Sequence, residues 1–273
     1  MAIAAASLGP IQMGRIAPPA IGRTRTIGAF LDFAATHPGV RLLMVDDGST
    51  DATGAMLAGM RAKAPASFAV LGHPQRRGKA EAVRTGMLAG LEQRAPLVGF
   101  FDADLSTPLA AVDDFLAVFR RRPALEFVLG SRVMLLGRDV TRKMTRHYLG
   151  RAFATAVSLA LDLPVYDTQC GAKVLRVTDS TPTLFAEPFR SRWVFDVELI
   201  ARYLRLPVGA GEPSRRDRLY ELAVPAWHDV PGSKLRWYDF VRATVDLARI
   251  RRERRRHQRA LRPQAPARSR WPS

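Results

Sequence analysis

Residues 97–108, LVGFFDADLSTP, place two aspartates directly after an uninterrupted apolar run. A run of this length without polar alternation is typical of a strand that is buried on both faces of a sheet. Ser106, Thr107 and Pro108 then favour the start of a helix, because small hydroxyl residues cap helices and proline fits their first turn. The stretch therefore predicts a strand, an acidic turn and a helix that continues to residue 119.

Short apolar runs alternate with helical periodicity on both sides of this stretch. Further strands are expected at residues 40–45, 68–71, 126–129, 172–177 and 219–224, and further helices at residues 51–61, 78–92, 193–204 and 235–262. A basic loop at residues 138–146 is expected to lead into another helix that ends near residue 161. This alternation predicts an α/β fold, a mostly parallel sheet flanked by helices.

The composition fits one catalytic domain with extensions. The chain has 273 residues, 47% of them hydrophobic, which excludes a disordered or fibrous protein. Its single cysteine, Cys170, cannot form an internal disulfide and argues against a Cys/His metal site, so we expect a cytoplasmic protein. Residues 1–14 lack the basic start of a signal peptide, and the longest apolar candidate, residues 152–161, is too short to cross a bilayer.

The net charge of +17 is concentrated at the end of the chain. From Arg249 onward there are ten arginines and one acid, Glu253, in a segment whose earlier part has an amphipathic pattern. Basic amphipathic helices lie on membranes, where anionic lipids attract each basic residue by about 1 kcal/mol. The alternative is a helix packed on its own domain with a solvated tail. No specific nucleic-acid partner is expected, because the arginines lack interleaved aromatic residues.

Two acidic clusters follow expected strands, and ligands of open parallel sheets bind at that end of the strands. In residues 45–51, VDDGSTD, Gly48 permits a tight turn, and Asp46 and Asp47 can accept hydrogen bonds from a ribose or base. The alternative is ordinary turn chemistry. Between the clusters, Lys79 offers a positive charge at the start of a helix, where anions bind, although plain solvated charge is the competing interpretation.

The second cluster contains Asp102 and Asp104, two residues apart. In extended chain such side chains point the same way, so both can face one divalent cation. Carboxylate oxygens suit Mg²⁺ or Mn²⁺, which would bridge the diphosphate of a nucleotide. The alternative is a turn and capping cluster. Together the two clusters favour metal and nucleotide binding.

Further motifs follow in order: GSR at residues 130–132, YDTQCGAK at 166–173, RWVFDVEL at 192–199, and E-x-x-x-P-x-W with GSK across 221–234. With the clusters above, they give residues 28–250 a resemblance to glycosyltransferase family 2 proteins of the GT-A fold, close to the dolichyl-phosphate glucosyltransferase branch. The resemblance implies nucleotide contacts by Asp47 and Lys79, a metal and diphosphate pair at Asp102 and Asp104, an acceptor-phosphate site at Arg132 with Arg142 or Arg146, and sugar-facing acids at Asp196 and Glu198.

The implied reaction is an inverting transfer of a hexose, with UDP-glucose favoured, to a polyprenyl phosphate at the cytoplasmic membrane face. An acceptor phosphate is already anionic near neutral pH, so the displacement needs charge stabilisation more than a strong base. The expected parts are an atypical segment 1–25, a catalytic domain 26–235, a basic amphipathic helix 236–262 and a disordered tail 263–273.

The start of the chain departs from the family pattern. Family members begin with an apolar strand and a Pro-Ala-Tyr-Asn-Glu-like turn, whereas Ile21, Gly22 and Arg23 stand here for the aromatic, amide and acid. An altered start, a relative of reduced activity and a different base contact each account for this. The alternative function is therefore a catalytically impaired protein that keeps the fold and binds membrane surfaces.

Overall fold

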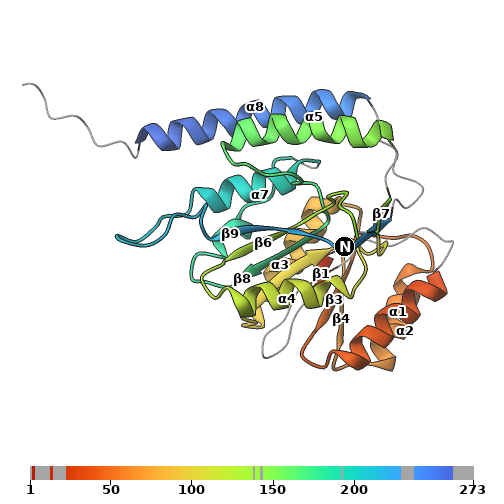
Figure 1. Ribbon diagram of the computed structural model, residues 1–273. Coiled ribbons are helices and arrows are strands. Elements are labelled where there is room, and N and C mark those ends of the chain that lie inside the picture. The colour runs from red at the N-terminus through yellow and green to blue at the C-terminus, as the bar shows by residue number, and fades with distance from the viewer. Residues whose placement is uncertain are drawn as a thin grey trace, which may run out of the picture.

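The computed structural model describes residues 2–3, 13–14, 23–137, 139–141, 144–191, 193–228 and 237–260 (Figure 1). The strands are β1 (Ala2–Ile3), β2 (Met13–Gly14), β3 (Leu42–Asp46), β4 (Phe68–Gly72), β5 (Leu97–Phe101), β6 (Phe127–Ser131), β7 (Asp139–Thr141), β8 (Ala172–Arg176), β9 (Leu219–Ala223) and β10 (Ala226–His228). The helices are α1 (Arg23–Thr36), α2 (Thr53–Lys63), α3 (Lys79–Glu92), α4 (Ala111–Arg121), α5 (Met144–Leu161), α6 (Thr183–Ala186), α7 (Phe195–Leu204) and α8 (Trp237–Ala260).

The strands form mixed sheets flanked by helices, which confirms the predicted α/β class. Of the two main sheets, one pairs β3 with β4 in parallel, and the second has the order β5-β8-β6-β9. In the second sheet β8 runs antiparallel to both β5 and β6, whereas β6 and β9 are parallel. Alternation of strands and helices along the sequence does not reveal this reversal of β8, so the sheet is less parallel than the sequence indicates.

The six expected strands are confirmed as β3, β4, β5, β6, β8 and β9. The expected basic loop at residues 138–146 is wrong in part, because it contains β7, which pairs in parallel with β10, and the start of α5. The short strands β1 and β2 pair with each other and lie against both β3 and β5, so they connect the two sheets. Residues 23–25 of the atypical segment begin α1, and apart from β1 and β2 its other residues, like the expected tail, lie outside the described residues.

The central sheet separates two apolar cores. Along β5, Leu97 and Phe101 belong to the core beneath α1, α2 and α4, whereas Val98 and Phe100 belong to the core beneath α3, α5 and α7. All five residues of β5 are buried, as its unbroken apolar run predicts. This burial on both faces fixes the end of β5, and therefore the position of the acidic turn that follows it.

Helix α8 packs along α5 and against α7 (Figure 1). Its residues Ala243, Leu247 and Ile250 are buried in the core. Glu253 forms ion pairs with Arg190 and Arg205, so charged as well as apolar contacts hold the helix to the domain. Within the described parts of the chain, no helix is both long and apolar enough to span a membrane.

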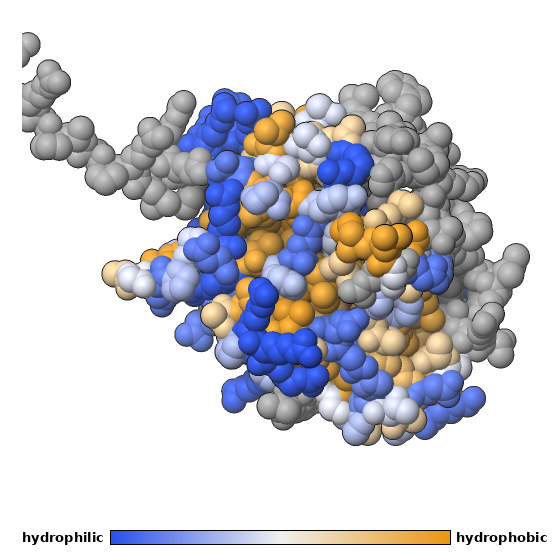
Figure 2. Space-filling view, in the orientation of Figure 1, coloured by the Kyte–Doolittle hydropathy of each residue, from blue (hydrophilic) through white to orange (hydrophobic). Residues whose placement is uncertain are grey.

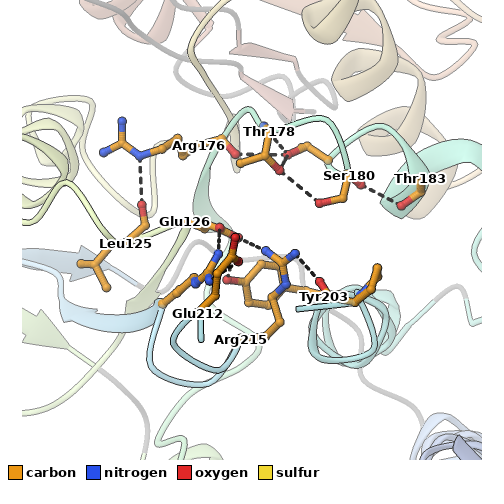
Figure 3. A network of polar contacts seen from close by, with 12 residues as sticks. Leu125, Glu126, Arg176, Thr178, Ser180, Thr183, Tyr203, Glu212 and Arg215 are labelled. Atoms are coloured by element: carbon orange, nitrogen blue, oxygen red, sulfur yellow. Dashed lines mark hydrogen bonds and ion pairs between the residues drawn. The ribbon is translucent and has the colours of Figure 1, made fainter. Parts of the chain in front are cut away.

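An ion-pair network fixes the start of β6 (Figure 3). The Glu126 carboxylate accepts hydrogen bonds from Arg215, from Arg218 at 2.7 Å and from the Tyr203 hydroxyl at 3.2 Å. Burial and the neighbouring Glu126 raise the pKa of Tyr203, so its hydroxyl stays protonated and donates. The network ties the segment before β9 to β6, at the end of the strand opposite Ser131.

Candidate active site

The site begins where β5 ends and α3 starts. The Lys79 Nζ lies 2.6 Å from Asp102 Oδ1, and both side chains are partly exposed, at 34% and 25%. Burial acts to lower the pKa of Lys79, but the charges of Asp102, Asp196 and Asp104 outweigh it and raise the pKa. Burial likewise acts to raise the pKa of Asp102, but Lys79 outweighs it and the pKa is lowered. The pair is therefore fully charged at neutral pH.

The Asp102 carboxylate also lies directly over the backbone of Gly171. A Cβ atom at Gly171 would stand 2.1 Å from Oδ2 and 2.2 Å from Cγ of Asp102, far inside contact distance. Only glycine fits there without moving the carboxylate. The YDTQCGAK motif thus supplies a surface against which Asp102 rests.

Asp104 follows in a turn rather than in extended chain. Its side chain is exposed and Oδ1 accepts a hydrogen bond from the Ser106 N–H at 2.9 Å, while Leu105 adopts a φ of +57°. The charges of Asp102 and Asp104 both act on Lys79, so the two acids lie at the same end of the sheet. The extended backbone expected for this pair is wrong, because the chain turns at Ala103 and Asp104, and the binding of one cation by both carboxylates stays a prediction.

The first acidic cluster shapes the loop that leads into α3. Asp47 is buried; its Oδ1 accepts from the Arg77 N–H at 2.8 Å and lies 3.0 Å from His73 Nδ1, and Oδ2 accepts from the Gly78 N–H at 2.8 Å. These bonds favour a positioning role for Asp47 over the base contact that the resemblance implies. Asp46 uses Oδ1 to accept from the Ser49 hydroxyl at 2.5 Å.

Gly48 brings this turn against the same loop. It has a φ of +69°, and a Cβ there would stand 2.5 Å from the carbonyl carbon of Gln75. Glycine is required here for two reasons, since other residues rarely adopt this φ and the backbone contact leaves no room. The loop before Lys79 is therefore held by both Gly48 and Asp47.

Arg132 follows the end of β6 and is fixed by Asp167 through two parallel bonds, from Nε at 2.6 Å and from Nη2 at 2.8 Å. Its guanidinium also lies over the Trp227 ring, 5.2 Å from the centroid. Burial acts to lower the pKa of Arg132, but Asp167 outweighs it and the pKa is raised, so the charge is permanent. Glu221 in turn accepts from the backbone N–H of Tyr166 at 2.9 Å and of Asp167 at 2.7 Å.

Asp196 and Glu198 begin α7 but have different surroundings. Asp196 accepts from the fully buried Lys173 Nζ at 2.5 Å, and that amine also donates to the Cys170 carbonyl at 2.6 Å. Glu198 accepts from the Arg190 N–H at 3.0 Å and from Arg202 at 2.8 Å. The structure thus connects Asp196 electrostatically with Lys79, whereas Glu198 stabilises the loop before its helix.

Several residues that build the site have roles that the sequence does not predict. Gly171, Asp167, Lys173 and Glu221 all lie in motifs that were recognised, but only the contacts reveal what each one does. Arg151 on α5 was missed, because it belongs to none of these motifs; its guanidinium stacks 3.8 Å from the Tyr166 ring centroid. Its Nη1 is buried without a hydrogen-bond partner among the described residues. Arg142, and the side chain of Arg146, lie outside the described residues.

The acids at the site suit a cation that is shared with a ligand. Among the described residues, no group of three or more His, Cys, Asp or Glu side chains could hold a metal ion alone. Mg²⁺ is commonly held by one or two carboxylates together with substrate phosphates and water. Asp102 and Asp104 fit that pattern, and so they could hold such a cation once phosphate oxygens complete its coordination.

Comparison with solved structures identifies the fold. The structure resembles that of glucosyl-3-phosphoglycerate synthase from Mycobacterium tuberculosis in complex with uridine diphosphate, with a TM-score of 0.56, 18% identity, and 88% of this chain and 79% of that chain covered. A second structure of that protein contains Mn²⁺, uridine diphosphate and glucosyl-3-phosphoglycerate, and matches with a TM-score of 0.54 and 19% identity. The predicted GT-A fold is thereby confirmed.

Relatives by sequence are dolichyl-phosphate beta-glucosyltransferases. The chain is 30% identical to that of Dictyostelium discoideum over 219 residues, which cover 77% of this chain and 62% of the relative. It is 28% identical to one from Trichomonas vaginalis over 216 residues, which cover 77% and 59%. The chain thus spans about 60% of the length of these curated relatives.

The family model described as glycosyl transferase family 2 matches residues 23–178, the part of the chain that carries Lys79, Asp102 and Arg132. Because this match spans more than half of the 273 residues, the chain belongs to glycosyl transferase family 2.

Proposed function

We propose that the chain transfers a hexose, glucose from UDP-glucose in the first place, to the phosphate of a polyprenyl phosphate with inversion at the anomeric carbon. One observation carries the proposal. The loop at residues 166–171 contacts Asp102 at one end and binds Arg132 at the other. A site for the donor diphosphate and a site for an acceptor phosphate are therefore built against the same short segment.

The donor side consists of Lys79, Asp102 and Asp104 at the start of α3 and the end of β5. The Lys79 amine and the positive N-terminal end of α3 attract a diphosphate. Asp102 and Asp104 would hold Mg²⁺ or Mn²⁺, which stabilises the negative charge on the departing diphosphate. The Mn²⁺ and uridine diphosphate in the structure of the M. tuberculosis synthase support this choice of ligands.

The acceptor side consists of Arg132 and, as a second contact, Arg151. Arg132 remains charged at any physiological pH and is held in place by Asp167, so it can bind a phosphate without being reoriented. A phosphate oxygen attacks the anomeric carbon, and the bond from that carbon to the diphosphate oxygen breaks. No strong base is required, which agrees with Asp196 being paired with Lys173.

We also propose that the protein acts at a cytoplasmic membrane face, where a polyprenyl phosphate lies. Arg251, Arg252, Arg255 and Arg256 near the end of α8 are exposed, and Figure 2 has hydrophilic residues gathered over that end of the helix. Each such residue near an anionic surface contributes about 1 kcal/mol of attraction. The names of the sequence relatives support dolichyl phosphate as the type of acceptor.

A catalytically impaired, membrane-binding protein is the second candidate. It is favoured by the sequence at the start of the chain, where Ile21, Gly22 and Arg23 stand for the aromatic, amide and acid of the family pattern. It predicts neither transfer nor hydrolysis with any sugar nucleotide, even with Mn²⁺ present.

The test is a thermal-shift panel of UDP- and GDP-sugars with and without Mn²⁺, followed by transfer assays on the stabilising donor with a polyprenyl phosphate. The wild type is compared with Asp104→Ala and with Asp32→Ala, which removes an exposed acid from α1. We expect stabilisation by one UDP-sugar that needs Mn²⁺, is lost in Asp104→Ala and persists in Asp32→Ala. Stabilisation without turnover would favour the second candidate, and no stabilisation by any donor would refute both nucleotide binding and transfer.

A further inference from the structure

The turn directly after Arg132 exposes three consecutive apolar side chains. Met134 is 48% exposed, Leu135 is 51% exposed and Leu136 is exposed at 106% of its reference area. Gly137 follows with a φ of +80° and ends the turn. Turn tips are normally polar, and a run of exposed apolar residues in a folded protein indicates an interaction surface.

Both ends of this turn are anchored to the domain. On one side β6 ends at Ser131, whose carbonyl accepts from the Val224 N–H at 3.0 Å, and Arg132 is bound to Asp167. On the other side β7 pairs with β10, and Val140 is buried. Figure 2 shows a group of apolar residues on the surface beside the place that β7 has in Figure 1. The turn is therefore held outward next to Arg132.

The sequence that surrounds the turn is basic, and this suits a surface of anionic lipid. From Arg132 to Arg146 the sequence has five basic residues and one acid, Asp139. A short apolar tip with basic flanks matches the hydrocarbon layer and the phosphate layer of a membrane at once. A second copy of this chain would instead have to bring the same positive charges together, so it suits the turn less well.

We propose that Met134, Leu135 and Leu136 insert into the apolar layer of an anionic membrane and thereby hold the acceptor side of the site against it. This insertion is an apolar contact, separate from the electrostatic attraction between the arginines of α8 and anionic lipids. Its purpose rests on the proposed function, because the hydrocarbon chain of a polyprenyl phosphate bound at Arg132 has to remain in the membrane. The insertion itself is a property of the turn and can be tested without any donor or acceptor.

The first experiment labels Leu136→Cys with an environment-sensitive fluorophore and adds vesicles of phosphatidylcholine with about one third phosphatidylglycerol. The natural Cys170 is fully buried, so the label goes to the introduced thiol. The control is Val208→Cys, which is 40% exposed in the segment between α7 and β9. We expect a blue shift and quenching by brominated acyl chains at position 136 and neither at position 208. An unchanged spectrum at position 136 on vesicle-bound protein would overturn the proposal.

The second experiment measures vesicle partitioning of a triple variant, Met134→Ser with Leu135→Ser and Leu136→Ser, and of the control Val208→Ser. We expect the triple variant to lose about tenfold or more in partitioning, since each buried side chain contributes through its apolar area, and the control to match wild type. Equal partitioning of the triple variant, or concentration-dependent self-association that the triple variant abolishes, would overturn the proposal.

Donor binding separates this inference from the proposed function. The triple variant should keep the thermal shift with UDP-glucose and Mn²⁺ and should lose transfer to acceptor in vesicles. Insertion without any transfer by the wild type would leave the membrane contact standing and refute the enzyme function. Transfer by the wild type without insertion at position 136 would refute the membrane contact and leave the enzyme function standing.

Discussion

The Asp102 carboxylate rests on the backbone of Gly171, at a distance that no side chain at position 171 would permit. The two residues lie 69 positions apart and meet because β5 and β8 are antiparallel neighbours, with Phe101 opposite Ala172. Asp102 and Gly171 directly adjoin that pair. The reversal of β8 in the sheet therefore brings the loop at residues 166–171 against Asp102.

Substituting Gly171→Ala should weaken donor binding by about tenfold or more, because Asp102 has to move away from Lys79 to make room for the methyl group. Calorimetric titration with UDP-glucose and Mn²⁺ checks this. The matched control is Gly54→Ala in α2, where a Cβ would meet nothing within 4 Å. Alanine in that helix should raise the free energy of unfolding by up to about 1 kcal/mol and leave binding unchanged. Normal binding by Gly171→Ala would contradict the role given to this contact.

Replacing Asp47→Asn should disturb the loop before Lys79. An amide in place of the carboxylate presents an NH₂ group to one of the backbone N–H donors of Arg77 and Gly78, which then lacks an acceptor. The expected loss is about 1–3 kcal/mol in the free energy of unfolding, measured with urea, together with weaker donor binding. Asp32→Asn in α1 serves as the control. If Asp47 instead contacts the base, binding will fall while the free energy of unfolding stays unchanged.

The network around Glu126 predicts a stability effect remote from the site (Figure 3). Glu126→Gln should lower the free energy of unfolding by about 3 kcal/mol, because Arg215 is then left buried without its carboxylate. Arg218 also pairs with Glu212, whose side chain is 51% exposed. Glu212→Gln should therefore change stability far less than Glu126→Gln does, because solvent screens an exposed pair. Urea unfolding measures the free energy of unfolding of both variants. Comparable losses would show that burial does not distinguish the Glu126–Arg215 pair from the Glu212–Arg218 pair.

The sequence was sufficient for the six five-residue strands, because their apolar runs are short and separated by turn residues, but it did not predict the shorter strands β1, β2, β7 and β10. Hydrophobic periodicity carries no information about strand direction, so the reversal of β8 was not predicted. For the site, too, the sequence pattern identified residues but not the contacts between distant ones. Asp102, Lys79 and Arg132 were recognised from motifs, but the pairing of Asp47 with Gly78 depends on a hydrogen bond across 31 residues, which no local pattern encodes.

Arg151 and the turn at residues 134–136 occupy environments that their sequence context does not predict. An arginine inside an amphipathic helix is expected to be solvated, and only the folded chain brings it onto Tyr166. Three apolar residues in a row are expected to be buried, and only the folded chain reveals their exposure. In both cases the information lies in the difference between the usual environment of a residue and the one that it occupies.

The thiol of Cys170 gives a test of the packing behind Gly171. Burial raises its pKa from 9.0 to about 11, so the folded chain binds the proton more tightly than the unfolded chain does. The stabilisation from the neutral thiol is therefore complete below pH 9 and is lost as the pH rises towards 11. We compare the free energy of unfolding at pH 8 with that at about pH 10.5. Over this range wild type should lose about 2 kcal/mol more than Cys170→Ala loses. Urea unfolding at the two pH values measures this difference, and alkylation of the native protein at pH 8 should be slow. Fast alkylation without unfolding, or equal pH dependence of the two proteins, would mean that water reaches the thiol and that the loop under Asp102 is less tightly packed than its contacts indicate.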